Sequence, residues 1–573
     1  MSRSAKTQYP VRNAVVLLLF VGVMVLLAAR AMYLQVFNTD FLQEQGNARH
    51  SRIVKDNSHR GMILDRNGSP LAVSTPVNSV WAHPETLAEE RRKWPRLAAL
   101  LGMSTHELAQ LISKNDGREF MYLKRHVPPE LAERVMALNV PGVALQREYR
   151  RYYPLGPVAG HVIGFTNVDD RGQEGAELAY ESWLRDVPGA KRLLRDLQGN
   201  AVEMAESVSL PQPGKDLTLS IDRRIQYLAY RELKAAITEH RAHAGSAIVL
   251  DARTGEVLAL VNEPDFNPNN RAGLRSSTFR NRAVTDLFEP GSTIKPFTVA
   301  CALESGKFSA GTVIDTTPGT FQVADRTIHD VHNYGVLTVA GVIEKSSNVG
   351  AAKIALALNK NSLWEMLRHS GFGQTTGVQL PGEVPGLLNP PSRWVPVDQA
   401  SIAYGYGISV TPMQLARAYL VLANDGVSLP LTLVRPETVP QGERVMSVAN
   451  ARRIQSMLEM AASNEGTGKA AQVADYRVAG KTGTVRKLTQ SGYSEEKYIS
   501  WFAGFAPVSA PRLVMVVAVD EPTQNGYYGG EVAAPVFGRV MTGALRLLNV
   551  SPDAPRQSLP ATRLMTVKSE VAE

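Results

Sequence analysis

Residues 288–306 read FEPGSTIKPFTVACALESG, and this stretch predicts a tight turn that leads into an apolar helix. A Pro-Gly pair before Ser292 forms the turn, apolar side chains follow at helical spacing, and a Ser-Gly pair at 305–306 ends the helix. Ser292 then lies at or near the helix N-terminus, where free amides and the helix dipole favour negative charge on a nearby oxygen. Lys295 projects from the same face one turn later, and a desolvated lysine can take a proton from the serine.

The pattern Ser-x-x-Lys is weak on its own, because residues 494–497 (Ser-Glu-Glu-Lys) also match it. That second copy lies in a polar stretch typical of a solvated surface. The Pro-Gly turn and the apolar helix therefore favour Ser292 as the nucleophile.

A second short motif, Ser346-Ser347-Asn348, lies in VIEKSSNVGAAKIALAL, where a polar turn meets a helix of small residues. A hydroxyl and an amide at this position can bridge a lysine and hold the amide group of a substrate. The alternative is an ordinary helix N-cap, which Ser and Asn prefer, and residues 113–115 also fit Ser-x-Asn.

A third motif, Lys481-Thr482-Gly483-Thr484, lies in YRVAGKTGTVRK. The residues before it predict an edge strand, and Gly483 would let a ligand approach the backbone closely. Lys481 and the threonine hydroxyls could hold a carboxylate, although a plain strand end explains the residues equally well. The order Ser-x-x-Lys, Ser-x-Asn, Lys-Thr-Gly is the signature of penicillin-interacting serine enzymes, so the three weak matches are jointly specific.

The N-terminal part of the chain predicts a membrane span. Residues 14–29 carry no charge, and with their flanks they reach about the 20 residues that a span needs. Basic residues precede the span and acidic residues follow it: Arg3, Lys6 and Arg12 before, Asp40 and Glu44 after. This bias places the N-terminus inside and the rest of the chain outside. The alternative is a signal peptide cleaved at Ala29-Arg30-Ala31, but the apolar run is longer than a typical signal core.

Composition limits the remaining possibilities. The chain has 573 residues, 44% hydrophobic and 20% charged, with a net charge of +8, which is typical of a globular protein of two or three folded units. No run of five like charges is present, which argues against nucleic acid as a partner, whereas a modest positive charge also suits a membrane or an anionic polymer. Cys301 is the only cysteine, so neither an intrachain disulfide nor a Cys-rich metal site can form.

Local patterns predict several elements. Asn67-Gly68 predicts a hairpin within 59–76, apolar spacing predicts helix in 86–113, and LTLSI (217–221) predicts a strand before a helix that runs to 237. Residues 244–264 read as a hairpin, 501–507 and 513–522 are two apolar runs joined by a Pro-containing turn, and the second run reads as a buried strand. The charged residues of the N-terminal region predict a surface ion-pair network and no catalytic site; they are Arg60, Asp65, Arg66, Arg147, Glu148, Arg150, Arg151, Glu174 and Glu177.

Longer stretches resemble the class B penicillin-binding proteins, and most closely the division-specific (septal) peptidoglycan D,D-transpeptidases. The resemblance covers nearly the whole chain and is carried by RGMILDRNGSPLA (60–72), GHVIGFTNVDDRGQEGAEL (160–178), DFNPNN (265–270), RNRAVTDLFEPGSTIKP (280–296), KSSNVG (345–350), YGYGISVTPMQLA (404–416) and YYGGEVAAPVFG (527–538). It implies an α+β fold: a transmembrane helix, an elongated α+β pedestal, and a penicillin-binding domain with an antiparallel sheet flanked by helices. The expected segments are a cytoplasmic tail 1–13, the helix 14–36, a pedestal or dimerisation-type domain 37–212, the transpeptidase domain 213–550 and a disordered tail 551–573.

The resemblance also implies roles for the motif residues. Ser292 would attack the penultimate D-Ala carbonyl of a stem peptide, Lys295 would be the general base, and Ser346 would relay the proton with Lys481 tuning it. Asn348 would orient the substrate amide, and the backbone amides of Ser292 and Thr484 would form the oxyanion hole. The hydroxyls of Thr482 and Thr484 would bind the terminal carboxylate, and Gly483 would belong to the same substrate-binding set. Tyr404 and Tyr406 are expected to line the pocket, with core packing as an equal alternative.

The expected partners are peptidoglycan stem peptides, β-lactams, a glycan polymerase of the SEDS family and other divisome membrane proteins, with no cofactor, metal or nucleic acid. The expected location is the cytoplasmic (inner) membrane, with the catalytic domain in the periplasm.

A β-lactamase is disfavoured because no Glu-x-x-Leu-Asn segment lies between the second and third motifs. A glycan-polymerising bifunctional enzyme is disfavoured because residues 37–210 lack the corresponding motif. A non-catalytic β-lactam sensor or divisome scaffold with the same fold is the remaining alternative.

Overall fold

The computed structural model describes residues 10–40, 51–195, 201–490 and 492–554. The chain divides into two compact units, and each unit is built from separated stretches of sequence. Unit 1 comprises Met1–His59, Pro76–Tyr149 and Asp186–Gly214, and unit 2 comprises Arg60–Thr75, Arg150–Arg185 and Lys215–Glu573. Residues 1–9 of the expected cytoplasmic tail and 555–573 of the expected disordered tail lie outside the described residues.

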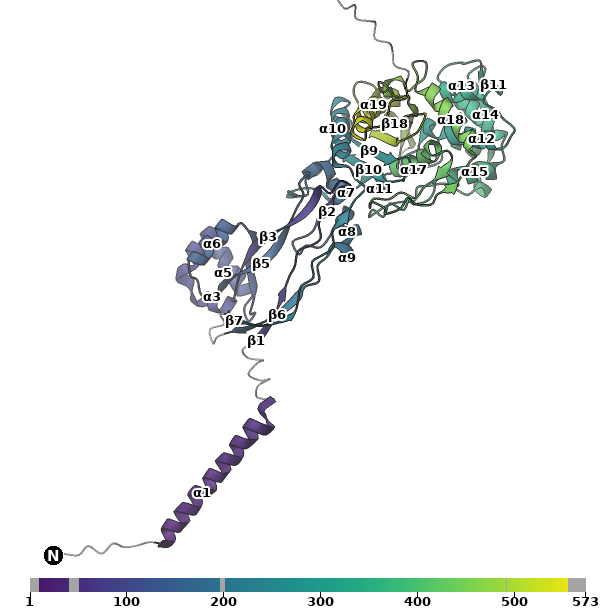
Figure 1. Ribbon diagram of the computed structural model, residues 1–573. Helices are drawn as coiled ribbons and strands as arrows, with labels where there is room; N and C mark the ends of the chain where they lie inside the picture. Colours follow the sequence, from purple (N-terminus) through teal and green to yellow (C-terminus); the bar gives the residue numbers. More distant parts are fainter. Residues whose placement is uncertain (1–9, 41–50, 196–200, 491, 555–573) are drawn as a thin grey trace, which may run out of the picture. The chain divides into compact units, whose positions relative to one another are not determined.

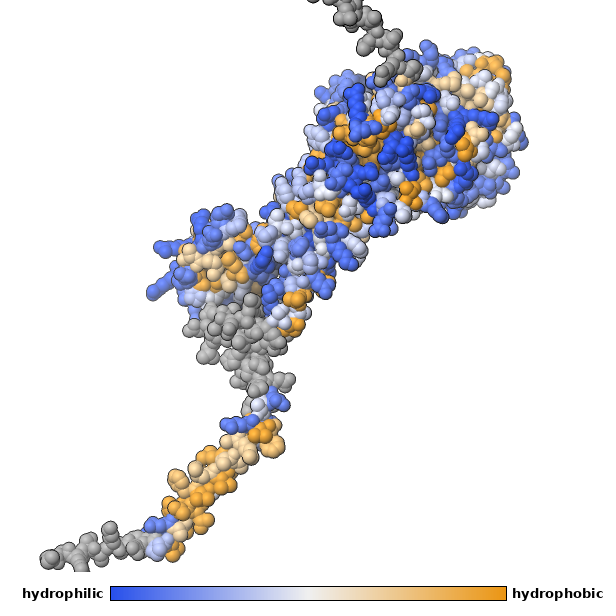
Figure 2. Space-filling model, viewed as in Figure 1, coloured by the Kyte–Doolittle hydropathy of each residue, from blue (hydrophilic) through white to orange (hydrophobic). Residues whose placement is uncertain are grey.

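The N-terminal helix α1 (Pro10–Met32) continues into a short π-helix, η1 (Tyr33–Phe37). Together they form one helix, Pro10–Phe37, that is long and apolar enough to cross a membrane, and the most apolar part of it is not buried in the protein. Apolar side chains cover its visible surface (Figure 2). The predicted span 14–36 lies within this helix.

The rest of unit 1 combines short helices with strands. Its helices are α3 (Pro84–Glu89), η2 (Arg91–Lys93), α4 (Trp94–Leu101), α5 (Thr105–Lys114) and α6 (Pro129–Ala137). Its strands are β4 (Met121–Val127), most of β5 (Val143–Tyr152), the second half of β3 (Pro70–Ala82), and an antiparallel sheet of β1 (Ser51–Asp56), β6 (Gly189–Arg195) and β7 (Ala201–Ser209). The helical pattern predicted in 86–113 is broken into separate helices partly because Gly102 adopts a φ of 70° and Ser104 starts α5 with a capping box.

In unit 2, the hairpin predicted within 59–76 is confirmed. Strand β2 (Ile63–Leu64) pairs antiparallel with β3 and parallel with β8 (Leu217–Thr218). The Asp65 carboxylate accepts hydrogen bonds from the backbone amides of Asn67 and Ser69, and Gly68 adopts a φ of 81°. Helix α10 (Arg223–Glu239) follows β8, as the pattern before residue 237 predicts.

A five-stranded antiparallel sheet forms the centre of unit 2, in the order β10-β9-β19-β18-β17. Its strands are β9 (Ala244–Asp251), β10 (Val257–Glu263), β17 (Ala479–Thr489), β18 (Gly492–Ala506) and β19 (Leu513–Asp520). The predicted hairpin at 244–264 and the buried strand within 513–522 are confirmed. The third motif lies on the edge strand β17, as predicted.

Helices cover both faces of this sheet (Figure 1). Ile248 and Leu250 of β9 pack into one apolar cluster with α12 (Lys295–Glu304), α17 (Pro412–Ala423) and α18 (Val448–Ala461). The alternate residues Ala247 and Val249 pack into a second cluster with α10 and α19 (Gly529–Leu547). A sheet that buries both faces needs apolar residues at successive positions, and every residue of β9 and β19 is buried. The predicted α+β class is therefore confirmed.

The remaining elements of unit 2 surround this core. They are η3 (Gly156–Ala159), α7 (Gly160–Ile163), α8 (Gly175–Ala179), α9 (Glu181–Leu184), η4 (Ser276–Phe279), α11 (Arg282–Thr285), η5 (Gly291–Ile294), α13 (Val339–Glu344), α14 (Asn348–Leu356), α15 (Lys360–His369), η6 (Pro391–Arg393), α16 (Pro396–Ile402), η7 (Lys469–Ala471), and the two-stranded pairs β11 (Val313–Asp315) with β14 (Val336–Thr338), β12 (Thr320–Val323) with β13 (Arg326–His329), and β15 (Val427–Ser428) with β16 (Glu443–Arg444).

A buried ion-pair network joins separated segments of unit 2. Arg60 contacts Glu177 and Glu181 at 2.6 Å each, and Arg151 contacts Glu177 at 2.6 Å. Glu177 is 0% exposed and Arg60 is 1% exposed. The prediction of a surface network is therefore wrong for these residues, because mutual pairing lets the charges be buried.

We expect Glu177→Gln to lower the free energy of unfolding by about 3–5 kcal/mol, since buried Arg151 loses the carboxylate it pairs with and buried Arg60 keeps only Glu181. The matched control is Glu85→Gln, an exposed acid in the first turn of α3, with an expected change within about 0.5 kcal/mol. Chemical denaturation measures both. Equal stability of the two variants would contradict a structural role for the network.

Candidate active site

Ser292 lies in the short 3-10 helix η5, which leads directly into α12. Glycines allow two other segments to reach this turn. A Cβ on Gly405 would lie 2.1 Å from the carbonyl oxygen of Gly291, and a Cβ on Gly483 would lie 3.0 Å from that of Pro290. The close approach that Gly483 permits is thus made by the segment that carries the serine. The edge strand can pack closely against the turn that carries the predicted nucleophile Ser292 (the nucleophile turn), because Gly483 has no side chain.

Lys295 connects the first two motifs. Its Nζ lies 3.0 Å from Ser292 Oγ, 3.2 Å from Ser346 Oγ, 2.8 Å from Asn348 Oδ1 and 2.5 Å from the Ser346 carbonyl oxygen. The Lys295 residue is fully buried. The structure therefore brings together four of the residues selected from sequence.

The four oxygens around Nζ are of two kinds. The Ser346 carbonyl and Asn348 Oδ1 only accept hydrogen bonds, and the Asn348 amide is oriented because its Nδ2 donates to the carbonyl of His329 at 3.0 Å. A neutral amine has two hydrogens and one lone pair. If these two acceptors take the hydrogens, the lone pair is left for the hydroxyl groups of Ser292 and Ser346. This arrangement suits a neutral lysine that accepts a proton.

The electrostatics point in the same direction. Burial lowers the pKa of Lys295 well below its usual value, the nearby Lys481 lowers it further, and Asp330 opposes this shift. Burial also lowers the pKa of Lys481 to about 7. Burial and the charge of a protonated Lys481 therefore favour an uncharged Lys295 beside the serine.

The second motif is held by an acid that the sequence patterns did not reveal. Asp330 accepts a hydrogen bond from Ser347 Oγ at 2.6 Å and from the backbone amides of Asn348 and Val349 at 2.5 and 3.0 Å. Ser347 also caps α14, as the N-cap reading predicts, by accepting from the Gly350 amide. The N-cap and the contact with the lysine therefore coexist in one motif.

Ser346 itself has an unusual backbone. Its φ is 61°, in the left-handed region that a serine seldom adopts. This conformation occurs at the residue whose carbonyl and hydroxyl oxygens both face Lys295 Nζ. Such local strain is maintained only where surrounding contacts fix the geometry.

The third motif supplies the opposite side of the site. Lys481 Nζ donates to the carbonyl of Thr482 at 3.3 Å and to Thr467 Oγ1 at 3.5 Å. The Thr482 and Thr467 hydroxyls lie 2.7 Å apart, and Thr484 Oγ1 accepts from the Gly529 amide at 2.9 Å. Thr467 was not selected from sequence, because it precedes the motif in a loop without a pattern of its own.

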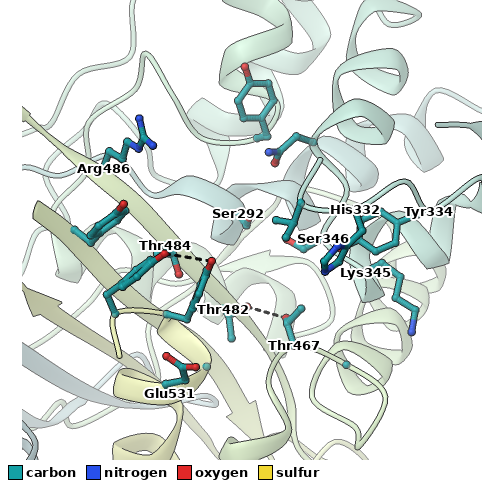
Figure 3. Close-up of a pocket in the computed structure, with 18 of the residues that line it drawn as sticks. Ser292, His332, Tyr334, Lys345, Ser346, Thr467, Thr482, Thr484, Arg486 and Glu531 are labelled. Carbon is teal, nitrogen blue, oxygen red and sulfur yellow. Dashed lines mark hydrogen bonds between the residues drawn. The ribbon is translucent and has the colours of Figure 1, made fainter. Parts of the chain in front are cut away.

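A cleft of about 660 Å³ opens over these residues, lined by Ser292, Ser346, Asn348, Thr482 and Thr484 (Figure 3). Tyr404 and Tyr406 also line it, and both pack partly against the core, so the two readings of these tyrosines both hold. Further lining residues that sequence reasoning missed are His332, Tyr334, Lys345, Lys469, Arg486, Tyr498, Tyr527, Tyr528 and Glu531. Some of them lie in family marks quoted from the sequence: Lys345 in KSSNVG, and Tyr527, Tyr528 and Glu531 in YYGGEVAAPVFG.

The competing Ser-x-x-Lys copy has a different environment. It lies on β18, where Ser494 Oγ accepts from the backbone amide of Lys497 at 3.2 Å. Lys497 is exposed and pairs with Glu521 at 2.9 Å. In the described part of the chain, no three His, Cys, Asp or Glu side chains are grouped closely enough to hold a metal ion.

Comparisons with known proteins agree with this geometry. The family model "Penicillin binding protein transpeptidase domain" matches residues 245–542, and "Penicillin-binding Protein dimerisation domain" matches residues 55–219. The "Probable peptidoglycan D,D-transpeptidase PbpC" of Pseudomonas aeruginosa is 41% identical over 542 residues, 95% of this chain and 96% of the relative. The "Peptidoglycan D,D-transpeptidase FtsI" of Escherichia coli is 41% identical over 533 residues, 92% of this chain and 90% of the relative.

Solved structures give the same result. The transpeptidase domain of penicillin-binding protein 3 from Burkholderia pseudomallei matches with a TM-score of 0.55 and 44% identity, covering 59% of this chain and 98% of that domain. A peptidoglycan synthetase from Bifidobacterium adolescentis matches with a TM-score of 0.71 and 26% identity, covering 88% of this chain and 98% of that protein.

The fold, the three motifs and these relatives together define a serine-type transpeptidase. The chain belongs to the penicillin-binding transpeptidases, and more narrowly to those that carry a dimerisation domain before the transpeptidase domain. The resemblance and the enzyme class inferred from sequence are confirmed.

Proposed function

We propose that this protein cross-links peptidoglycan stem peptides through an acyl-enzyme on Ser292, and that it does so during septal wall synthesis. The observation that carries the chemistry is the 3.0 Å contact between Lys295 Nζ and Ser292 Oγ in a buried site that favours a neutral lysine. Relatives named peptidoglycan D,D-transpeptidases support the substrate, and the resemblance to septal enzymes supports the cellular role.

In the first step, neutral Lys295 takes the hydroxyl proton of Ser292 while Oγ attacks the penultimate D-Ala carbonyl carbon. The backbone amides of Ser292 and Thr484 stabilise the oxyanion of the tetrahedral intermediate. Ser346, 3.2 Å from Lys295 Nζ, passes the proton to the departing D-Ala amine, and Lys481 tunes this transfer. An ester on Ser292 remains.

Substrate binding uses the edge strand and the second motif. The hydroxyls of Thr482 and Thr484 bind the terminal carboxylate beside Lys481, and Gly483 keeps the strand against the nucleophile turn. Asn348 orients the substrate amide, while Tyr404 and Tyr406 line the pocket. A β-lactam carries a comparable carboxylate and carbonyl, so it acylates the same serine and inhibits the enzyme.

The apolar helix α1 anchors the protein in the cytoplasmic membrane, with residues 1–13 in the cytoplasm and the residues after the helix in the periplasm. This orientation rests on the charge bias around the helix. A SEDS-family glycan polymerase and other divisome membrane proteins are the partners that the resemblance implies. N-terminal sequencing of the mature protein tests the anchor, because a chain starting at Met32 would mean that the helix is removed.

The decisive experiment supplies the purified full-length protein with a stem pentapeptide ending in D-Ala-D-Ala and a second stem peptide with a free amine. We expect cross-linked dimer together with at least an equal amount of free D-Ala, measured by mass spectrometry, and neither product from Ser292→Ala. Penicillin acylation without D-Ala release or dimer would instead identify a β-lactam sensor. Fluorescence microscopy of a tagged protein tests the septal role.

A further inference from the structure

One charged residue of the cleft has no part in the mechanism above. Among the described residues that line the cleft, Glu531 is the only acid, whereas Lys345, Lys469 and Arg486 are bases. The Glu531 side chain is exposed, and no ion pair within the described part of the chain neutralises it. Its negative charge is therefore available to a molecule in the cleft.

The position of Glu531 is fixed by the start of α19. The Gly529 amide donates to Thr484 Oγ1 at 2.9 Å, and a Cβ on Gly530 would lie 3.7 Å from Thr482 Cγ2. These contacts hold the first turn of α19 against the strand that carries the third motif, and Glu531 is the next residue of that turn (Figure 3).

The backbone next to this turn also leaves room for the carboxylate. A Cβ on Gly526 would lie 2.2 Å from Glu531 Oε2, so only glycine fits there without moving the acid. The φ of 96° at Gly526 likewise favours glycine.

We propose that Glu531 is a specificity-determining residue for the acyl acceptor, and that its carboxylate attracts the primary ammonium group of the second stem peptide. This inference rests on the proposed transpeptidase function. The two substrates of that reaction differ in charge at the ends that enter the cleft: the donor brings a carboxylate and the acceptor brings an amine. A single acid among bases distinguishes them by attraction and repulsion.

The proposed role concerns binding and leaves the chemical step to other residues. The ammonium releases one proton to solvent, and the neutral nitrogen attacks the ester carbonyl carbon on Ser292. The C–N bond forms, the C–Oγ bond breaks, and the second amine proton passes through Lys295 to Ser292 Oγ. Glu531 exchanges no proton. Because a carboxylate favours the protonated amine, it increases occupancy by the acceptor without accelerating the attack itself.

The test compares Glu531→Gln with the parent protein, both full length in detergent. A thioester donor analogue acylates Ser292, and a stem tetrapeptide with a free side-chain amine is the acceptor. We expect the half-saturating acceptor concentration to rise about three- to tenfold, with the limiting rate of aminolysis unchanged within about twofold. Hydrolysis of the same acyl-enzyme should not change.

Two further measurements separate electrostatics from a loss of structure. Acylation by a carboxylate-bearing penicillin should be as fast as in the parent or slightly faster, because the acid that repels it is gone. Rising salt should weaken acceptor use by the parent protein and affect Glu531→Gln much less. Glu531→Asp should restore most of the acceptor affinity.

The matched control is Glu130→Gln, which removes the same charge from the first turn of α6 in unit 1. It should leave acceptor use unchanged. An unchanged half-saturating concentration in Glu531→Gln would overturn the inference, as would equal losses in acceptor use, hydrolysis and penicillin acylation. If the parent protein is acylated but uses no acceptor, the proposed function itself fails, and the inference fails with it.

Discussion

Replacing Ser292 with alanine is expected to abolish covalent labelling by a fluorescent penicillin. Ser292 Oγ lines the cleft 3.0 Å from Lys295 Nζ, and removal of a serine nucleophile typically costs on the order of 10⁶-fold in rate. The label should therefore fall below detection on a denaturing gel, while the unfolding transition of the variant stays close to that of the parent.

The second Ser-x-x-Lys copy provides the control. Ser494→Ala should label as the parent does, because Ser494 accepts from a local backbone amide and its lysine pairs with Glu521. Labelling that survives in Ser292→Ala and disappears in Ser494→Ala would show that the nucleophile has been assigned to the wrong copy.

Lys295→Arg is expected to lower the rate of acylation by about 10²- to 10⁴-fold, the usual contribution of a general base. Arginine keeps a positive charge at all accessible pH values and cannot take the serine proton. Stopped-flow acylation with a chromogenic β-lactam measures the change, and Lys497→Arg in the surface copy should have no effect. An arginine variant that acylates at the parent rate would contradict the role of Lys295 as base.

The pH dependence gives an independent check of the same base. Burial and the neighbouring Lys481 lower the pKa of Lys295, so the neutral, active form persists to a pH well below the usual lysine range. As the pH falls through that lowered pKa, Lys295 gains a proton and acylation should fall, approaching tenfold per pH unit. An acid limb near the pKa of an ordinary lysine would contradict the proposed electrostatics.

Much of the catalytic unit could be predicted because local patterns and global packing agree there. The turn before Ser292, the helix behind it and the edge strand of Lys481 each have a short sequence signal, and each lies where the signal places it. The order of the three motifs along the chain also predicted that these three segments form one site, which no single motif predicts.

Residues that act through tertiary contacts could not be found in this way. Asp330 reaches the second motif from the end of a small hairpin, and nothing around it in the sequence marks an acid that binds the amides of Asn348 and Val349. Thr467 likewise depends on the packing of its loop against Thr482. Recognising Asp330 and Thr467 as site residues therefore requires the three-dimensional structure.

The charges of the N-terminal region show a different limit. Sequence patterns favoured a surface network, since charged residues are seldom buried. Arg60 and Glu177 are buried because chain folding brings distant segments of unit 2 together, with bonds that satisfy most of their polar atoms. The two members of such an ion pair are far apart in the sequence, so local sequence patterns do not reveal them.

The strand order of the central sheet has a consequence for how the chain matures. Strand β9 pairs on one side with its neighbour β10, but on its other side with β19, in the register Asp251 to Leu513. During synthesis, the edge of β9 that pairs with β19 stays unpaired until nearly the whole polypeptide has been made. Pairings between such distant segments form slowly, and an uncovered apolar edge readily pairs with other chains. A product truncated before β19 would therefore be an aggregation-prone fragment, and its insolubility on expression would report the missing strand, even though the fragment retains all three motifs.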